Sequence, residues 1–109
     1  MKLAKELRET TRKIKEEQVA KTKKECNGII SKIEDAMRQR AAQGKDYIYV
    51  QFSPFDEDTT NNPLETGIII FRREDVTDVI VAEDYLIEYF LENEFEVRKT
   101  SLDELYIEW

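Results

Sequence analysis

The alternation of apolar and polar positions divides the chain into a helical first part and a later part in which strands alternate with one helix. Residues 2–43 contain no proline, one glycine and many Lys, Glu, Arg, Gln and Ala residues, which have high helix propensity. Gly44 follows at the position where a helix commonly ends in a left-handed residue. The pattern therefore predicts a helix over residues 2–43.

The apolar stripe of this helix changes at its middle. In the first half the apolar positions are sparse and separated by charges: Leu3, Leu7, Ile14 and Val19. In the second half they recur at helical spacing and predict a buried stripe: Ile29, Ile30, Ile33, Met37 and Ala41. Asn27 and Gly28 mark the expected break or kink, and Ser31 with Glu34 matches a capping box that would begin a second helix.

The later part predicts strands where apolar and polar residues alternate. Residues 46–53 predict a strand with one set of side chains toward the core, Ile48, Val50 and Phe52, and another set on the opposite face, Tyr47, Tyr49 and Gln51. A second, more apolar strand is predicted over residues 67–73, after a polar loop with a proline at each end. Residues 95–99 and 104–109 predict a terminal hairpin.

One further helix is predicted over residues 77–93, with four core candidates: Ile80, Ile87, Phe90 and Leu91. The element order is then α-(α)-β-β-α-β-β, which indicates a two-layer α+β fold with a largely antiparallel sheet of three to four strands. The length of 109 residues is typical of one domain. We expect a single domain over residues 1–109, with a compact core over 27–109. Residues 1–26 either pack on that core or project from it as a charged helix.

Charge is divided unevenly along the chain. Residues 1–45 hold 13 of the 17 Lys and Arg residues against 7 of the 24 Asp and Glu residues, a net charge of +6. Residues 46–109 hold the other 4 basic residues against 17 acidic ones, a net charge of −13. This division predicts two surfaces with opposite electrostatic preferences, suited to different partners.

The sequence lacks the side chains that common enzyme chemistry requires. It has no histidine, one cysteine and three scattered glycines, which removes histidine-based triads, ordinary zinc sites and glycine-rich phosphate loops. We therefore expect a non-enzymatic protein with no cofactor, no catalytic residues and no metal ligands. Cys26 has two interpretations: its neighbours Lys21, Lys23 and Lys24 lower the thiol pKa and make it reactive, or, as we favour, it is a small side chain near the helix kink.

The acidic loop after the first strand invites a metal-binding interpretation. An EF-hand register that starts at Asp56 places Asn61 where glycine is required and Gly67 where a bidentate glutamate is required, which excludes an EF-hand. The sequence leaves open whether residues 55–62 bind a divalent ion weakly, form a solvated loop or present residues 55–58 to a partner.

The acidic half supplies the candidates for recognition. Closely spaced carboxylates in the predicted second helix could imitate nucleic-acid phosphates and block a basic groove on a target protein. Tyrosines are favoured in protein interfaces, and two of them share the outward face of the first strand. The candidate partner-binding residues are Glu83, Asp84, Glu88, Glu92, Tyr47 and Tyr49.

The basic N-terminal helix supports an alternative. The candidate nucleic-acid contacts are Lys13, Lys21, Lys24 and Arg38. Interspersed glutamates favour instead a solvated face with ion pairs one turn apart, and no aromatic residue precedes Tyr47 to stack on a base. A third interpretation is pairing with another chain along a sparse apolar seam formed by Leu3, Leu7 and Ile14.

Three segments together resemble small, mostly uncharacterised proteins of bacteriophages and prophages: the Lys- and Glu-rich first helix, the segment EYFLENEFEV over residues 88–97, and the closing LYIEW. The similar proteins often have a glycine before the aromatic residue. Here Glu94 takes that position before Phe95, which leaves the exit from the helix open to a different geometry. The resemblance implies no known activity and no functional residues. It does imply a class of role, because accessory phage proteins of this size often bind and inhibit a host protein, including defence nucleases.

We therefore expect a non-enzymatic interaction protein that binds and inhibits a host protein, such as a nucleic-acid-binding one, through its acidic surface. Two alternatives stay open: a nucleic-acid-binding accessory protein that uses the basic helix, and a structural or assembly subunit that forms homo-oligomers through that helix. The single cysteine, the lack of a signal-peptide pattern and the lack of a long apolar run predict the cytoplasm of a bacterial host and no membrane contact.

Overall fold

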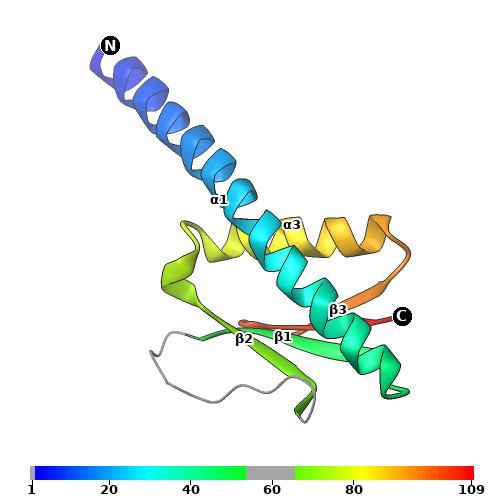
Figure 1. Ribbon diagram of the computed structural model, residues 1–109. Helices are drawn as coiled ribbons and strands as arrows, with labels where there is room; N and C mark the ends of the chain where they lie inside the picture. The colour runs from blue at the N-terminus through cyan, green and yellow to red at the C-terminus, as the bar shows by residue number, and fades with distance from the viewer. Residues whose placement is uncertain (1, 54–65) are drawn as a thin grey trace.

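Two helices pack against one face of a four-stranded sheet in the computed structural model, which describes residues 2–53 and 66–109 (Figure 1). The elements in chain order are α1 (Lys2–Ala42), β1 (Tyr47–Ser53), β2 (Ile68–Arg72), the 3₁₀ turn η1 (Arg73–Asp75), α3 (Val79–Glu92), β3 (Glu96–Ser101) and β4 (Glu104–Glu108). This order confirms the predicted α+β class, with its second helix and its terminal hairpin.

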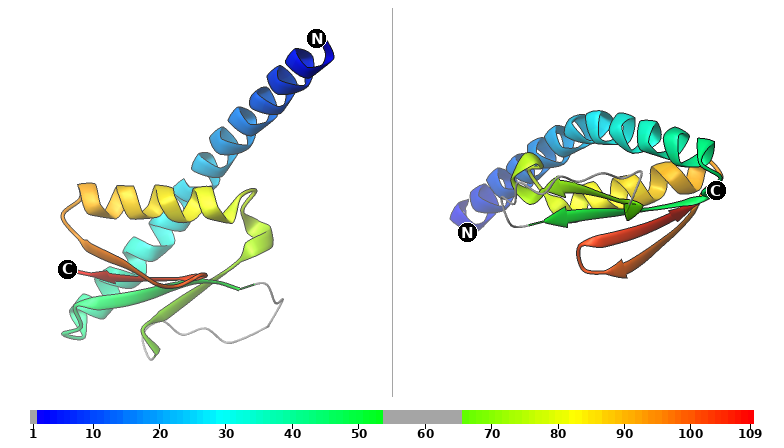
Figure 2. Two further views of the ribbon diagram at one scale, coloured as in Figure 1. Left: turned by 180° about the vertical axis from the view of Figure 1, so that it is seen from behind. Right: turned by 60° about the horizontal axis from the view of Figure 1, so that its bottom comes forward.

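The sheet is mixed and has the strand order β2-β1-β4-β3. β4 runs antiparallel to both β1 and β3, as expected, whereas β1 and β2 are parallel. The predicted alternation in β1 is confirmed, because Ile48, Val50 and Phe52 are buried and the residues between them are half-buried. These buried side chains and those of β4 face the helices, and neither helix covers the opposite face of the sheet (Figure 2).

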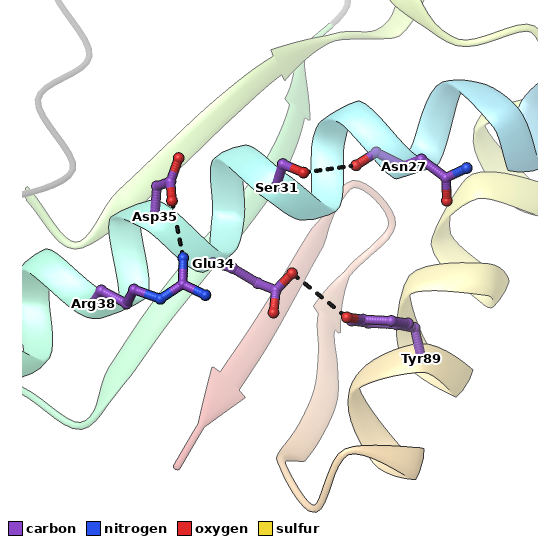
Figure 3. Close-up of polar contacts among 6 residues, drawn as sticks. All are labelled: Asn27, Ser31, Glu34, Asp35, Arg38 and Tyr89. Carbon is purple, nitrogen blue, oxygen red and sulfur yellow. Dashed lines mark hydrogen bonds and ion pairs between the residues drawn. The ribbon is translucent and has the colours of Figure 1, made fainter.

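Helix α1 is continuous through Asn27 and Gly28, so the expected break and the second N-cap are wrong. Ser31 Oγ donates a hydrogen bond within the helix to the Asn27 carbonyl oxygen (3.2 Å), and Glu34 accepts a long hydrogen bond from the Tyr89 hydroxyl of α3 (3.5 Å; Figure 3). One interior glycine weakens a helix by only about 1 kcal/mol. Buried residues on both sides of Gly28 offset that loss: Cys26, Ile29, Ile30 and Ile33.

Both helices end in a residue with a positive φ angle. Gly44 has φ 83°, and the Lys45 N–H donates back to the Arg40 carbonyl oxygen (3.0 Å), which confirms the predicted C-terminal cap. Glu94 has φ 70° after α3, and the Phe95 N–H donates back to the helix in the same way (2.9 Å). Glu94 thus takes the left-handed exit that glycine favours, although the sequence left a different exit open.

The N-terminal part of α1 extends beyond the sheet and α3 (Figures 1 and 2). Residues 2–18 are all exposed, and Thr22 is the first buried residue of the helix. Exposed apolar side chains lie along this extension: Leu3, Leu7 and Ile14. The extension gives the molecule its long dimension of 62 Å.

Helix α3 packs on the sheet through residues four apart. Asp78 caps its first turn by accepting a hydrogen bond from the Val81 N–H (3.2 Å). Its buried apolar stripe consists of Ala82, Leu86 and Phe90. Of the predicted core residues, Phe90 is buried and Ile87 packs at the edge of the core, but Ile80 and Leu91 are 71% and 52% exposed. The prediction was wrong for these two because the stripe at 82, 86 and 90 places them on the opposite side of the helix.

Candidate functional site

The outer face of α3 combines acidic and apolar side chains. Asp84, Glu88 and Glu92 are exposed and four residues apart, so they follow one side of the helix. Their side chains form no hydrogen bond or ion pair with the residues that the structure describes, although the charge of Asp84 contributes to the raised pKa of Lys99. Ile80 and Leu91 lie within the same sector, about one third of the helix circumference. We call these five residues the outer face of α3.

Glu83, the fourth acidic candidate of this helix, does not belong to the outer face. Its side chain is 3% exposed, and its Oε2 atom lies 2.8 Å from Nζ of Lys99 on β3. This hydrogen bond is the main reason that the pKa of Lys99 is raised. Glu83 Oε1 is also buried and has no hydrogen-bond partner among the described residues. Glu83 is therefore not part of the exposed acidic surface on which it was predicted, because the packing of α3 on β3 turns it inward.

A small cavity adjoins Glu83 between the start of α3 and the β3–β4 hairpin. Its volume is about 290 Å³, and its lining consists of Arg73, Val79, Ile80, Glu83, Lys99, Leu102 and Asp103. Leu102 is 84% exposed and lies at the hairpin turn, and Ile80 belongs to both the cavity lining and the outer face of α3. No pattern in the sequence predicts this cavity, because its two walls come from segments that are separated along the chain.

Tyr47 and Tyr49 lie together on the sheet face that the helices do not cover, where Tyr106 of β4 joins them. Ring centroids are 5.2 Å apart for Tyr49 and Tyr106 and 6.0 Å apart for Tyr47 and Tyr106. The Tyr106 hydroxyl donates to Glu108 (2.9 Å), and this hydrogen bond is the main cause that raises the Tyr106 pKa to about 12. The Arg98 guanidinium lies 5.7 Å from the Tyr106 ring centroid. The three rings are thus half-buried and packed on one another, and a glutamate lies directly beside them.

The basic candidates lie on α1 and do not form one cationic surface. Lys13, Lys21 and Lys24 are exposed, but Glu17 is four residues from both Lys13 and Lys21 and lies on the same side of the helix. Arg38 donates to Asp35 at 3.0 Å, near the other end of the helix (Figure 3). The four residues are therefore interrupted by carboxylates, as the interpretation of a solvated helix face requires.

Cys26 is fully buried in α1 against α3. Burial and, to a smaller extent, the charge of Glu25 raise the pKa of its thiol from 9.0 to about 11. The Cys26 sulfur lies 4.0 Å from the Ala82 carbonyl oxygen. The interpretation of a reactive thiol activated by neighbouring lysines is therefore wrong, and the small buried side chain is confirmed.

Within residues 2–53 and 66–109, no three acidic or cysteine side chains are arranged to hold a metal ion. The loop at residues 55–62, for which a weak divalent-ion site, a solvated loop and a partner-binding tip at 55–58 were left open, lies outside the described residues. No helix in the described part of the chain has the length and apolar character needed to cross a membrane.

Comparison of the chain with protein-family models, curated proteins and solved structures found no match. The resemblance to bacteriophage proteins therefore stays an expectation from the sequence. The outer face of α3 and the cavity beside it are the features that bear most directly on function.

Proposed function

We propose that this protein is a non-enzymatic interaction protein that binds a basic surface of a partner protein through the outer face of α3. One observation carries the proposal: Asp84, Glu88 and Glu92 form an exposed row whose carboxylates make no ion pair with a basic side chain of the described residues. Two exposed apolar side chains, Ile80 and Leu91, lie in the same sector. A surface of this composition suits a partner that presents Lys or Arg together with apolar side chains.

The physical chemistry of the row supports binding to a basic surface. Successive carboxylates in the row are separated by one helical turn, about 6 Å of rise along the axis. The second part of the chain has only 4 basic residues to balance 17 acidic ones, so its negative potential extends into the solvent. Such a potential accelerates association with a positively charged surface and selects against acidic ones. Burial of Ile80 and Leu91 on binding would then contribute about 25 cal/mol for each Å² of apolar surface removed from water.

The role that fits this surface best is inhibition by occupation. A line of regularly spaced negative charges resembles the charge pattern of a nucleic-acid backbone, so a groove that binds nucleic acid is a suitable target. The sequence resemblance to phage accessory proteins points in the same direction, toward a host protein such as a defence nuclease. The protein would inhibit such a target by occupying its basic groove.

Affinity capture from bacterial lysate, with and without nuclease treatment, tests the proposal. The bait variants are the wild type, the neutral triple variant D84N/E88Q/E92Q, and a matched control, E6Q/E9Q/E16Q, which removes three charges from the exposed part of α1. We expect one host protein to be captured near stoichiometry by the wild type and the control, and to be lost with the triple variant. Equal capture by all three baits would refute the proposal. Capture that disappears with nuclease treatment would favour the basic helix and nucleic acid.

The exposed part of α1 favours a second candidate function, self-assembly. Residues 2–18 of the helix are all exposed, and Leu3, Leu7 and Ile14 lie along them. Isolated helices of this length are marginal in water, so a partner helix would stabilise it. Sedimentation velocity over a range of concentrations tests this function. Association that is lost in Leu7→Glu would support it, and a monomer at all concentrations would exclude it.

A further inference from the structure

Glu83 presents an unusual combination of burial and incomplete hydrogen bonding. Its carboxylate is almost fully buried, and Lys99 engages only Oε2. Oε1 is buried and has no donor among the described residues. A buried carboxylate oxygen without a donor is unfavourable, so this atom favours any donor that can reach it.

The cavity beside Glu83 offers a route to that carboxylate. Its volume of about 290 Å³ is at the lower limit for small-ligand sites and suits a single side chain. Val79, Ile80 and Leu102 provide an apolar part of its lining, and the last two are largely exposed at the rim. Glu83 and Asp103 provide carboxylates, and Asp103 has only a loose ion pair with Arg73, at 3.8 Å. The lining thus combines apolar side chains with two carboxylates and with the basic groups of Arg73 and Lys99.

We propose that this cavity receives one arginine side chain of the partner protein that binds the outer face of α3. The inference rests on the proposed function and specifies the partner's chemistry at one point. Ile80 links the two sites, because it belongs to both the outer face and the cavity lining. The arginine stem packs against Ile80 and Leu102, and its guanidinium donates to Glu83 Oε1 while Lys99 keeps Oε2.

The chemistry of the cavity favours arginine over the other candidates. An anionic ligand could pair with Arg73 or Lys99 of the lining, but it would leave Glu83 Oε1 without a donor. A lysine ammonium is strongly hydrated and compact, whereas the planar guanidinium presents five N–H donors and is more weakly hydrated. The guanidinium can therefore serve Glu83 and still face Asp103. Arginine is also among the residues that dominate binding energy at protein interfaces.

Methyl NMR on the full chain tests the inference without knowledge of the partner. The probes are the peptide N-acetyl-Gly-Arg-Gly-amide and its citrulline analogue, which has the same shape but no charge. We expect saturable shifts of the Val79, Ile80 and Leu102 methyl signals with the arginine peptide. The dissociation constant of the citrulline peptide should be higher by about tenfold or more, because a charge-assisted hydrogen bond is lost. The absence of shifts with either peptide would mean that solvent fills the cavity, and would overturn the inference.

Two variants complete the test. Glu83→Gln removes the buried charge, and Leu102→Ser removes apolar surface at an exposed position that does not affect the core; both should abolish or weaken arginine binding. D84N/E88Q/E92Q should retain it, because that row lies outside the cavity. Equal binding of the arginine peptide by wild type and Glu83→Gln would overturn the inference. Failure of the proposed function gives another result. The host protein would then be captured equally by the wild type and D84N/E88Q/E92Q, while the arginine peptide would still bind in the cavity.

Discussion

Glu83 of α3 and Lys99 of β3 form an ion pair, with 2.8 Å between Oε2 and Nζ, that connects the helix layer to the edge strand of the sheet. The two partners differ in their surroundings, because the Glu83 side chain is 3% exposed and that of Lys99 is 45% exposed. Lys99 therefore covers a buried charge from the solvent side. The attraction within the pair contributes less to stability than its loss would cost, because removal of Lys99 would leave the buried Glu83 carboxylate without a counter-charge.

Removal of Lys99 should destabilise the protein more than neutralisation of Glu83. Lys99→Met leaves a buried carboxylate without a counter-charge, and we expect the free energy of unfolding to fall by about 1–3 kcal/mol. Glu83→Gln removes the charge and leaves a neutral amide, which is less costly to bury than an unpaired carboxylate, so a loss of about 1 kcal/mol is expected. Urea unfolding measures both values. Arg98→Gln is the control, because the ion pair of Arg98 with Glu96 is exposed and should contribute less than about 1 kcal/mol. A loss of stability in this control as large as that in Lys99→Met would contradict this interpretation.

The same alanine substitution should have opposite effects at two glycines. Gly67 has φ 72°, and a Cβ atom there would lie 2.9 Å from Nη2 of Arg40, which is itself buried and donates to the Tyr47 carbonyl oxygen. We expect Gly67→Ala to lose about 1–3 kcal/mol of stability. Gly28 lies in the interior of α1 with open space around it, so Gly28→Ala should gain about 0.5–1 kcal/mol. Thermal unfolding of the two variants is the measurement, and a shift of the same sign in both would be inconsistent with this geometry.

Glu94 offers a stabilising substitution at the exit from α3. A residue with a side chain at φ 70° is strained relative to glycine by about 1 kcal/mol or more. Glu94 is exposed, so removal of its side chain sacrifices little packing. We expect Glu94→Gly to raise the midpoint of urea unfolding, whereas Glu92→Gly, inside the last helical turn, should lower it. If both substitutions lowered the midpoint, the positive φ angle would carry no strain.

The Tyr106 phenol should ionise late because of Glu108. Its hydrogen bond to that carboxylate is the main cause that raises the pKa to about 12, so absorbance titration should show at least one tyrosine that ionises well above 10. Glu108→Gln should return this pKa toward 10, whereas Glu96→Gln should leave it unchanged. The folded state holds the phenol proton more tightly than the unfolded chain. The contribution to stability is therefore complete below pH 10 and falls as the pH rises toward about 12.

Removal of residues 1–18 should leave the stability of the remaining fold almost unchanged. Residues 2–18 are exposed throughout, so their loss removes helix but no buried surface. We expect the free energy of unfolding to change by less than about 0.5 kcal/mol, while helical circular dichroism decreases. Extension of the deletion to residue 26 removes the buried Thr22 and Cys26 and should destabilise the fold markedly. A large loss from the shorter deletion would show that the extension contributes to folding, for instance by pairing with a second chain.

Local pattern predicted the elements of the fold well. The alternation of Ile48, Val50 and Phe52 identified β1 and its buried face, and Gly44 identified the end of α1. The prediction failed where packing between distant segments decides the outcome. The stripe through Gly28 keeps α1 intact despite a local breaker signal, and the parallel pairing of β1 with β2 depends on contacts that no short window of sequence contains.

The candidate site was predictable only in part for the same reason. Asp84, Glu88 and Glu92 are exposed as a row, as their spacing suggested. Glu83 has the same chemistry and an adjacent position, yet it is buried because α3 packs on β3 with that side inward. Its partner, Lys99, lies sixteen positions further along the chain in another element, and only the tertiary fold brings the two together.

The position of β4 also sets the order of events when the chain is made. β4 is the last element along the chain, yet it lies inside the sheet between β1 and β3. Until the ribosome releases residues 104–108, β3 has no neighbouring strand and one edge of β1 remains unpaired, with Ile48 and Val50 beside it. Open edges of this kind readily pair with other chains. During synthesis β1 and β3 therefore keep edges open for pairing until β4 inserts between them.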